Sequence, residues 1–483
     1  MEGLVRVLEA AFTAASGGFR KTIGAQSVVS PAQAGGFVIG HALPFGNCGL
    51  EPGEPVIGED GLPTLVMGGS GRGKTTYVRR STAFEFTNGR TVVSLDFRGD
   101  GNRDICRDLA AMGSDAPPTA LLDAGSETHV PPFDFLGHGG GSAFSRASVM
   151  RDVFKEVAEG WGVRIAFNAL VAFLACAELG LGLTEIREIL APDGRLREYA
   201  LERITDPATA ASLRDYCSLT TEAQSTQWQE IANKLHAWIF QEDMRLMLGA
   251  DSAPDLRRML DVPGNVTLVS LGVSKVPAAA LMGKLLVSAI VRHVMARAEV
   301  EKSDRPFFRL YVDELSNLGH IGGLEEILAE GRRLGASITG AFQESSQIPA
   351  SLLRSFRANA ATQIYFAAGA AEAAEAAAEV ASDLPREAVR QEIMSLKTGQ
   401  AIVVRRGLPA AKVQMPDFPV PTVSEAQLQR FTERALDAGC PTRETVRSIL
   451  AARERWLVGL GDSACKPSID HGRRPGRKRG SDE

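Results

Sequence analysis

Thr64-Leu-Val-Met67 runs directly into Gly68-Gly-Ser-Gly-Arg-Gly73-Lys74-Thr75-Thr76. An apolar strand, a glycine-rich turn, and a lysine followed by hydroxyl residues at the start of a helix form the pattern GxxxxGK[ST] in its usual context. Such glycines let successive backbone N–H groups point at phosphate oxygens, and the N-terminus of the helix adds its positive dipole end. The residues predicted to bind nucleotide are Gly68, Gly69, Ser70, Gly71, Arg72, Gly73, Lys74, Thr75 and Thr76.

A phosphate-binding loop of this type implies ATP and Mg²⁺ as cofactors. We expect Lys74 to meet the β- and γ-phosphates and Thr75 to ligate Mg²⁺. The apolar strand Phe307–Val312 ends in Asp313-Glu314. Asp313 is predicted to hold the metal, and Glu314 to accept a proton from the attacking water, which favours hydrolysis over kinase transfer or a slow GTPase switch. Acidic residues also occur at the ends of strands simply because they favour turns. The glycine-rich loop upstream nevertheless favours the catalytic interpretation of Asp313 and Glu314.

Further downstream, Glu330-Gly-Arg332-Arg333-Leu-Gly335 precedes a strand that ends before Gln343. A polar amide at the carboxyl end of a parallel strand lies where ligands bind in such sheets, so Gln343 is predicted to orient the attacking water. Arg332 and Arg333 would be too far from their own loop at a subunit edge, but well placed to reach the nucleotide of a neighbour. The alternative for these arginines is a solvated helix end.

Strand-like segments recur along the chain, and helix-period segments separate most of them, which predicts an α/β fold with a mainly parallel sheet. The predicted strands are Gly36–Ile39, Thr64–Met67, Thr91–Leu95, Val266–Leu271, Phe307–Val312, Ser337–Phe342, Thr362–Phe366 and Ala401–Val404. Between about 142 and 260 the pattern is helical throughout, which predicts an all-helical insertion in the sheet.

Composition excludes several classes of protein. With 483 residues, 44% hydrophobic and 23% charged, the chain is predicted to be a globular, multi-domain protein. With a net charge of −5, the protein lacks the positive electrostatic field that is typical of a protein that simply coats nucleic acid. Six scattered cysteines and seven histidines show no metal-like spacing, so no metal beyond Mg²⁺ is expected. The two longest apolar runs contain charged residues and are expected to be buried helices, which predicts a cytoplasmic protein.

The order of these motifs resembles the type IV secretion coupling proteins, the TraG/TraD-like ATPases of conjugation, within the HerA/FtsK group of ring-forming DNA motors. In that family a strand ends in Asp-x-Lys-Gly-Glu/Asp, matched here by Asp96-Phe-Arg98-Gly99-Asp100, and a helical domain follows. The resemblance covers roughly residues 36–410. The chain departs from the family at Gly69, Arg72, Arg98 and Glu344, and no membrane anchor is expected in the 67 residues before Gly68.

The resemblance implies a RecA-like P-loop NTPase fold and a homo-hexameric ring that translocates DNA, expected to be single-stranded, through its channel. Arg332 then matches the finger that acts on the neighbouring subunit, and Gln343 the sensor. The helical insertion would receive a relaxase or other relaxosome protein. Contact with type IV secretion channel proteins would place the protein peripherally at the inner membrane.

The predicted domains are a helical leader (1–34), a first nucleotide-binding part (35–141), the helical insertion (142–260), a second nucleotide-binding part (261–423) and a C-terminal helical segment with a basic tail (424–483). Two alternatives to a conjugative motor stay open. One is a HerA/FtsK-like helicase or translocase in repair, segregation or packaging. The other is a nucleotide-dependent adaptor that does not translocate DNA.

Overall fold

The computed structural model describes residues 36–58, 61–157, 160–272, 279–319, 321, 323–380 and 382–459. Its strands form one 11-stranded sheet with the order β2-β1-β11-β10-β9-β3-β8-β7-β4-β6-β5. The strands are β1 (Val38–Leu43), β2 (Pro55–Ile57), β3 (Thr64–Met67), β4 (Thr91–Asp96), β5 (Thr119–Asp123), β6 (Val266–Ser270), β7 (Phe308–Asp313), β8 (Ala336–Phe342), β9 (Thr362–Phe366), β10 (Gln400–Arg405) and β11 (Ala411–Gln414).

The larger part of the sheet is parallel. All neighbouring pairs from β9 to β5 run parallel, whereas the pairs from β9 outward to β2 are antiparallel. In β3, β4, β6 and β8 every residue is buried. Continuous burial is typical of parallel strands covered on both faces. The predicted mainly parallel α/β sheet is therefore confirmed, with an antiparallel extension at one end.

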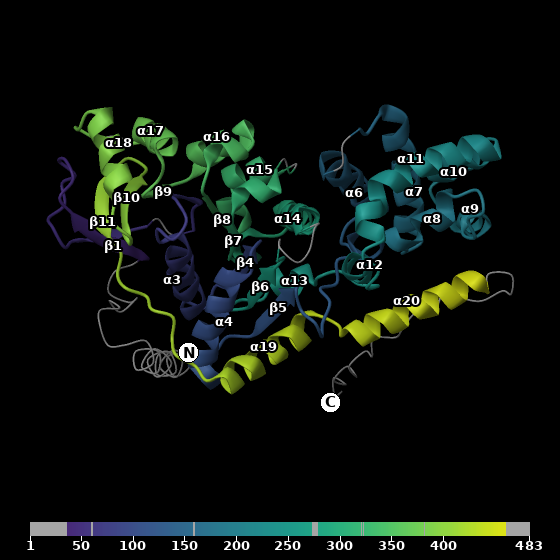
Figure 1. Ribbon diagram of the computed structural model, residues 1–483, viewed down its shortest axis with the longest axis horizontal. Helices are drawn as coiled ribbons and strands as arrows, with labels where there is room; N and C mark the ends of the chain where they lie inside the picture. Colours follow the sequence, from purple (N-terminus) through teal and green to yellow (C-terminus); the bar gives the residue numbers. More distant parts are fainter. Residues whose placement is uncertain are drawn as a thin grey trace, which may run out of the picture.

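Helices cover both faces of the sheet (Figure 1). On one face lie α3 (Lys74–Thr87), α4 (Asp100–Met112) and α19 (Glu425–Gly439), which share a core with alternate strand residues such as Val66 and Val92. On the other face lie α14 (Ala279–Ala296), α15 (Leu324–Glu330) and α16 (Ala350–Asn359), which pack against the intervening residues such as Leu65 and Val93. Successive strand residues point to opposite faces, so the two cores divide each strand between them.

The segment between β5 and β6 is helical, and most of it forms a lobe beside the β5 end of the sheet (Figure 1). No strand occurs among the described residues of 142–260, as the sequence predicted. Its helices are α6 (Ala143–Val157), α7 (Val163–Glu178), α8 (Ile186–Leu190), α9 (Arg197–Arg203), α10 (Pro207–Cys217), α11 (Thr221–Ile239), α12 (Glu242–Leu248) and α13 (Leu256–Leu260). We call the part from α6 to α12 the helical lobe.

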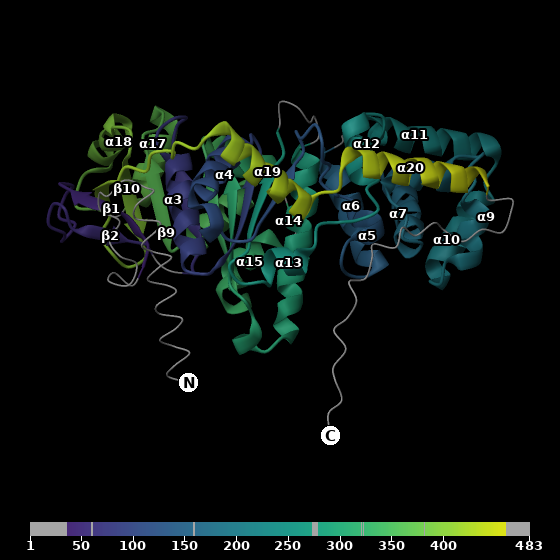
Figure 2. The ribbon, with the colours of Figure 1, turned by 90° about the horizontal axis from the view of Figure 1, so that it is seen from below.

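The C-terminal helices run from the sheet to the helical lobe (Figure 2). Helix α19 packs on β5, and α20 (Arg443–Val458) packs on α12. In α20 the buried Arg453 pairs with Glu185 at 3.1 Å and with Asp251, and Trp456 meets Tyr199 edge to face at 5.3 Å. We call α19 and α20 together the C-terminal strap. The predicted leader helix before residue 35 and the basic tail after 472 lie outside the described residues.

Arg453 belongs to a larger ion-pair network between the strap and the lobe. His138 lies 3.0 Å from Asp134 and 3.3 Å from Asp251. These three side chains are close enough to share a metal ion, but Asp251 also accepts a hydrogen bond from the Arg453 guanidinium. A fixed cation already neutralises part of the cluster, so its arrangement fits an ion-pair network that joins the two parts.

The sequence-based prediction missed three strands: β2, β5 and β11. Strand β2 has only three residues, β5 mixes buried and half-buried positions after two prolines, and β11 carries Lys412 and Gln414. Short strands with polar positions give a weak alternation, and their pairing partners lie far away in sequence. The first predicted strand, 36–39, is observed instead as β1 at Val38–Leu43.

One helical stretch, Ala279–Glu299, is long and apolar enough to cross a membrane by length and composition, with a mean hydropathy of 1.5. However, 72% of it is buried within the chain, where α14 packs against the sheet and α6. Core helices of globular proteins have the same composition. Its burial agrees with the buried helix expected here.

Candidate functional site

The glycine-rich loop sits at the carboxyl end of β3, between the ends of β8 and β9. Its backbone is held on both sides, since Gly68 N–H donates to Phe342 O at 3.3 Å and Gly69 N–H donates to Ala367 O at 2.9 Å. A β-carbon on Gly68 would lie 2.5 Å from Phe366 Cβ, and Gly73 has a φ of 123°. Neither position accepts another residue without strain, so the curled loop requires these glycines.

Lys74 is the first residue of α3, and its side chain reaches back into this loop. Its ammonium group donates to the carbonyl oxygens of Gly68 and Gly69 at 2.6 and 3.0 Å, and the side chain is buried. Burial lowers the pKa of Lys74 below its ordinary value, while the nearby carboxylates of Asp313 and Glu314 oppose that shift. The acids that the sequence predicted as partners of Lys74 are therefore close enough to act on its charge.

Both acids stand at the end of β7, two strands away from β3 in the sheet. Asp313 is the last residue of β7, and Glu314 follows it with a φ of 74°. A positive φ is costly for a residue with a side chain and occurs where the surrounding structure enforces it. Here it turns the chain sharply after Asp313, and Ser316 Oγ donates to Glu314 Oε1 at 2.9 Å.

The pKa of Asp313 is raised to about 6, mainly by burial and then by the negative charge of Asp96. Asp96 is the residue directly opposite Asp313 on the neighbouring strand β4. A buried and a half-buried carboxyl group side by side favour a cation between or beside them, since a metal ion removes the repulsion. This charge pattern fits the Mg²⁺ ligand that the sequence predicts at Asp313.

The raised pKa has a consequence for stability that can be measured. Between pH 4 and 6 the folded protein holds a proton on Asp313 that the unfolded chain has lost, so this group makes the unfolding free energy fall as pH rises. We expect Asp313→Asn, which cannot titrate, to lack this fall. Without Mg²⁺, its stability relative to the native protein should increase by about 1–2 kcal/mol from pH 4.5 to pH 7.5. Urea unfolding at the two pH values measures this, and an equal difference at both would contradict it.

Asp96 has a structural task that sequence reasoning missed. Its Oδ1 accepts from the N–H groups of Arg98 and Gly99 at 2.8 Å, and its Oδ2 accepts from Asn102 N–H at 3.0 Å. A buried carboxylate with three backbone donors fixes the turn into α4. The sequence signal for this structural role was an acidic residue at the end of a strand, with Arg98-Gly99 two residues after it. The turn brings Arg98 near Lys74, where the Arg98 charge lowers the pKa of the lysine further.

Gln343 directly follows β8, which lies between β3 and β7 in the sheet. It therefore stands at the same edge, between the glycine-rich loop and Asp313, and its side chain is half-buried. The neighbouring Glu344 is exposed and accepts from Gln347 Nε2 at 2.6 Å. The structure thus brings Gln343 into the group formed by Lys74, Asp313 and Glu314.

Arg332 is a predicted site residue that lies far from the glycine-rich loop of its own chain. It is exposed in a 3₁₀ turn (Gly331–Leu334) just before β8, at the opposite edge of the sheet from Gln343. Since β8 has seven residues at about 3.3 Å each, roughly 20 Å separates the two edges. Arg332 is therefore too far away to reach a nucleotide at the loop of its own chain, and its action on another subunit stays a prediction.

The residues at this edge fit a nucleotide with Mg²⁺. The loop can only be formed with glycines, it contains a buried cation at Lys74, and exposed Ser70 and Thr75 flank that cation. Oxygen ligands for Mg²⁺ are available from Thr75 and Asp313. Thr75 lies close to the first turn of α4, because a β-carbon on Gly101 would be 3.4 Å from Thr75 Cγ2 and 3.2 Å from Asp96 Oδ2.

Comparison with known proteins finds similarity in one segment of the sequence and in the fold. Residues 308–401, from the start of β7 into β10, match the family model described as the TraM recognition site of TraD and TraG. This segment is similar to TraG/TraD proteins. This segment includes four of the predicted site residues, Asp313, Glu314, Arg332 and Gln343. No curated protein matches the sequence.

Solved structures extend the likeness to most of this TraG/TraD-like chain. The plasmid coupling protein TrwB in complex with ADP and Mg²⁺ is 16% identical, with 77% of this chain and 90% of TrwB covered and a TM-score of 0.52. TrwB with the ATP analogue ADPNP is 17% identical, with 75% and 87% covered and the same TM-score. VirB4 of Thermoanaerobacter pseudethanolicus is 14% identical, with 82% and 98% covered, also at 0.52. The chain has the RecA-like fold of these proteins.

Within the TraG/TraD-like sheet, two buried polar contacts join the helix of the loop to the strand of the acids. Arg309 Nε of β7 donates to Glu85 Oε1 of α3 at 2.6 Å, and the Tyr311 and Ser81 hydroxyls lie 2.7 Å apart. Arg309 and Glu85 are both almost fully buried. Directional contacts of this kind fix the position of one element on another. They set where Lys74 stands relative to Asp313.

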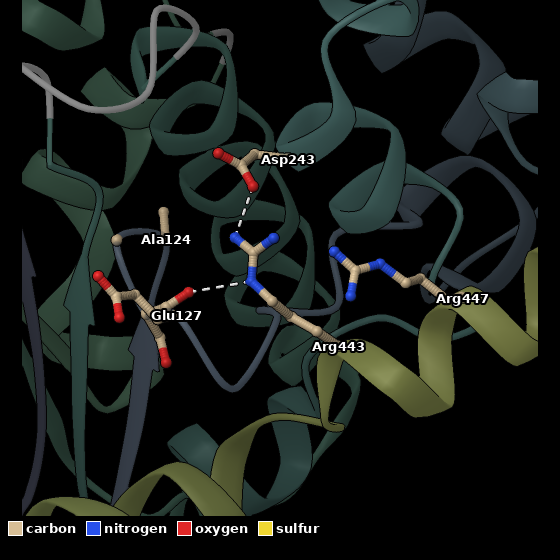
Figure 3. Close-up of a pocket in the computed structure, with 7 residues that line it drawn as sticks. Ala124, Glu127, Asp243, Arg443 and Arg447 are labelled. Atoms are coloured by element: carbon tan, nitrogen blue, oxygen red, sulfur yellow. Dashed lines mark hydrogen bonds and ion pairs between the residues drawn. The ribbon is translucent and has the colours of Figure 1, made fainter.

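A cavity of about 450 Å³ lies away from this site, between the end of β5, the helical lobe and α20 (Figure 3). Arg443 points into it, where it pairs with Asp243 and donates to the Ser126 carbonyl at 3.2 Å. The neighbouring Arg447 pairs with Glu242 at 2.7 Å. Since both arginines are neutralised by acids, the cavity is a junction between the strap and the lobe and offers no free cation to a ligand.

Proposed function

We propose that this TraG/TraD-like chain is an ATPase that works as a hexameric ring and moves DNA, as a coupling protein of conjugative transfer or type IV secretion. One observation carries the proposal: Lys74, Asp313 and Glu314 stand at the same carboxyl edge of β3, β8 and β7, near enough for both acids to raise the pKa of the lysine against the effect of its burial. TrwB, which shares the fold, has been solved with ADP and Mg²⁺ and with an ATP analogue.

The chemistry assigned to each residue follows from its position. Lys74 binds the β- and γ-phosphates, and Thr75 and Asp313 hold Mg²⁺. When bound, Mg²⁺ supplies positive charge that stabilises the developing charge on the phosphate oxygens. Glu314 accepts the proton of the attacking water, and Gln343 orients that water from the strand between the loop and the acids. Each of these roles is a proposal for the residue named.

The ring is proposed because the site is incomplete within one chain. Arg332 lies at the opposite edge of the sheet from the loop, so an arginine that joins Lys74 at the γ-phosphate would come from a neighbouring subunit. In such a ring single-stranded DNA would pass through the channel, and only the lysines and arginines that face it need to meet phosphates. A net charge of −5 is compatible with such local contacts.

The proposed partners follow from the matched segment and the lobe. The family model for residues 308–401 is described as a recognition site for TraM, so we propose that this segment takes part in binding an accessory protein of DNA processing. The helical lobe is the proposed receiver of a relaxase. We place the protein in the cytoplasm, at the inner membrane through secretion channel partners.

The test is ATP hydrolysis measured against protein concentration, with and without single- and double-stranded DNA. We expect a cooperative dependence on concentration, stimulation by DNA, and a stimulation that weakens steeply with salt, because phosphate contacts release counterions. Lys74→Ala is the control that should lose hydrolysis under every condition. Turnover by a monomer that is indifferent to polynucleotide would contradict the motor and support the adaptor alternative.

A further inference from the structure

A buried lysine joins the helical lobe to the turn that carries Glu314. Lys284 lies in the apolar core helix α14, where its side chain is only 7% exposed. An ammonium group in such surroundings is costly unless it is paired. Its Nζ forms an ion pair at 3.0 Å with Glu156 Oε1, near the end of α6, and α6 packs against α14 (Figure 1). A residue of the lobe therefore neutralises a charge inside the core helix.

This ion pair lies directly against one end of the turn 314–319. A β-carbon on Gly319 would overlap Glu156 Oε1 and would lie 2.8 Å from Lys284 Nζ. Gly319 also has a φ of 56°, a conformation that residues with a side chain rarely adopt. The glycine thus lets both charged groups touch the backbone, and the pair limits where this end of the turn can lie.

The rest of the turn connects Gly319 to the carboxylate of Glu314. Its 3₁₀ segment, Leu315–Leu318, packs against α14, and both of these leucines are fully buried. Within the segment, Ser316 Oγ donates to Glu314 Oε1 at 2.9 Å, and Asn317 N–H donates to Glu314 O at 3.2 Å. The turn therefore holds the carboxylate at one end and meets the ion pair at the other.

Helix α14 is also in close contact with the strand next to β7. A β-carbon on Gly283, the neighbour of Lys284, would lie 2.7 Å from the ring of Phe97. Phe97 is buried and directly follows Asp96 at the end of β4. Such close packing leaves α14 little room to shift relative to the ends of β4 and β7. Lys284 is thus a fixed point from which the turn 314–319 can be held.

We propose that Lys284 and Glu156 are positioning residues for hydrolysis: together they hold the turn 314–319 so that the Glu314 carboxylate faces the attacking water. The inference rests on the proposed function, in which Glu314 is the general base, and adds that a residue of the helical lobe takes part in placing it. Neither Lys284 nor Glu156 touches the nucleotide. Displacement of a catalytic group by about 1 Å can cost about 10²-fold in rate, so loss of the pair should slow hydrolysis and spare binding.

Single-turnover hydrolysis and equilibrium binding of ATP by Lys284→Met and Glu156→Ala test this inference. Each variant should lower the rate of hydrolysis about tenfold or more and leave the Kd of ATP within about twofold. The variant with both substitutions should be no slower than the slower single variant, because the two residues act as one unit. Lys284→Met places an apolar group of similar size in an apolar helix, so folding should be retained.

Arg292→Met is the matched control. Arg292 also joins α14 to α6, since its Nη1 donates to Ser145 O at 3.0 Å. It lies eight residues beyond Lys284, about 12 Å further along the helix and away from Gly319. This variant should hydrolyse ATP at close to the native rate. An equal loss in Arg292→Met and Lys284→Met would mean that general packing of α6 on α14 is responsible, which would overturn the inference.

The Glu314→Gln background distinguishes positioning of Glu314 from a merely structural role. A residue that acts through Glu314 loses its effect once position 314 can no longer accept a proton, so adding Lys284→Met to Glu314→Gln should not slow hydrolysis further. A further loss of the same size in this background would overturn the inference, as would native rates in both Lys284→Met and Glu156→Ala.

Failure of the inference can be told apart from failure of the proposed function. If Glu314→Gln is slow while Lys284→Met and Glu156→Ala are not, the inference alone fails and the general base stands. If Glu314→Gln hydrolyses ATP at the native rate, the proposed role of Glu314 and the inference fail together.

Discussion

Glu314→Gln should lower the rate of ATP hydrolysis by about 10²–10⁴-fold, the usual contribution of a positioned general base, and leave ATP binding intact. The amide has the same shape and keeps the backbone turn at a φ of 74°, but it cannot accept a proton from water. Its neighbour Asp313, the proposed Mg²⁺ ligand, is unchanged. Single-turnover hydrolysis with radiolabelled ATP, together with equilibrium binding, separates the two effects.

Glu344→Gln is the matched control for this substitution. Glu344 is also a glutamate just beyond the end of a strand at this edge of the sheet, but it is exposed and contacts Gln347. Its replacement should leave hydrolysis within about twofold of the native rate, as expected for a surface residue. A Glu314→Gln protein that hydrolyses ATP at the native rate would remove Glu314 from the chemistry, and loss of ATP binding in that variant would make it a binding residue.

The sequence predicted the parts of this edge that are continuous in the chain. The bounds of β3 and β9 were predicted to the residue, because β3 lies between Pro63 and Gly68 and β9 is rich in β-branched and aromatic residues. The loop between β3 and α3 follows from its glycines and lysine. The order β3-β8-β7 places Gln343 between loop and acids, and only the structure provides that order.

Contacts between distant segments could not be predicted from one sequence. Arg309 and Glu85 are 224 residues apart, and Arg453 and Glu185 are 268 apart. Considered alone, each of these four residues is predicted to be a charge on the surface of its helix or strand, because charged residues are almost never buried unless they are paired. The contact of Phe418 with α3 gave no signal either, because Phe418 lies in a proline-rich segment and its hydrogen-bond partner Arg79 is 339 residues away.

The C-terminal strap connects the segment beside the glycine-rich loop to the helical lobe. The segment that carries Phe418 leads into α19, which packs on β5, and then into α20, which packs on the helical lobe. A change in the position of the segment beside the glycine-rich loop would thus be passed along one continuous chain to the lobe. The buried pair of Arg453 with Glu185 resists separation of α20 from the lobe, because either charge alone would be costly to leave buried.

Arg332→Ala should lower the rate of hydrolysis in the assembled protein by about 10³-fold or more, as for arginine fingers in other NTPases. Arg332 is exposed at the edge of the sheet opposite its own loop, so its positive charge is available only to a neighbouring subunit. Nucleotide binding to the separate chain should not change. Arg333→Ala is the matched control: Arg333 is the adjacent exposed arginine and pairs with Glu330 at 2.6 Å, so its loss should have little effect.

Mixing two inactive variants tests whether Arg332 acts on another subunit. Lys74→Ala subunits keep an intact Arg332, and Arg332→Ala subunits keep an intact loop. In a head-to-tail ring assembled from equal amounts of both, about a quarter of the interfaces combine an intact loop with an intact arginine. We therefore expect the mixture to recover hydrolysis that neither variant shows alone, in proportion to the intact interfaces. If Arg332 serves its own loop, no interface in the mixture is complete and the mixture stays inactive, which would overturn the assignment to the neighbouring subunit.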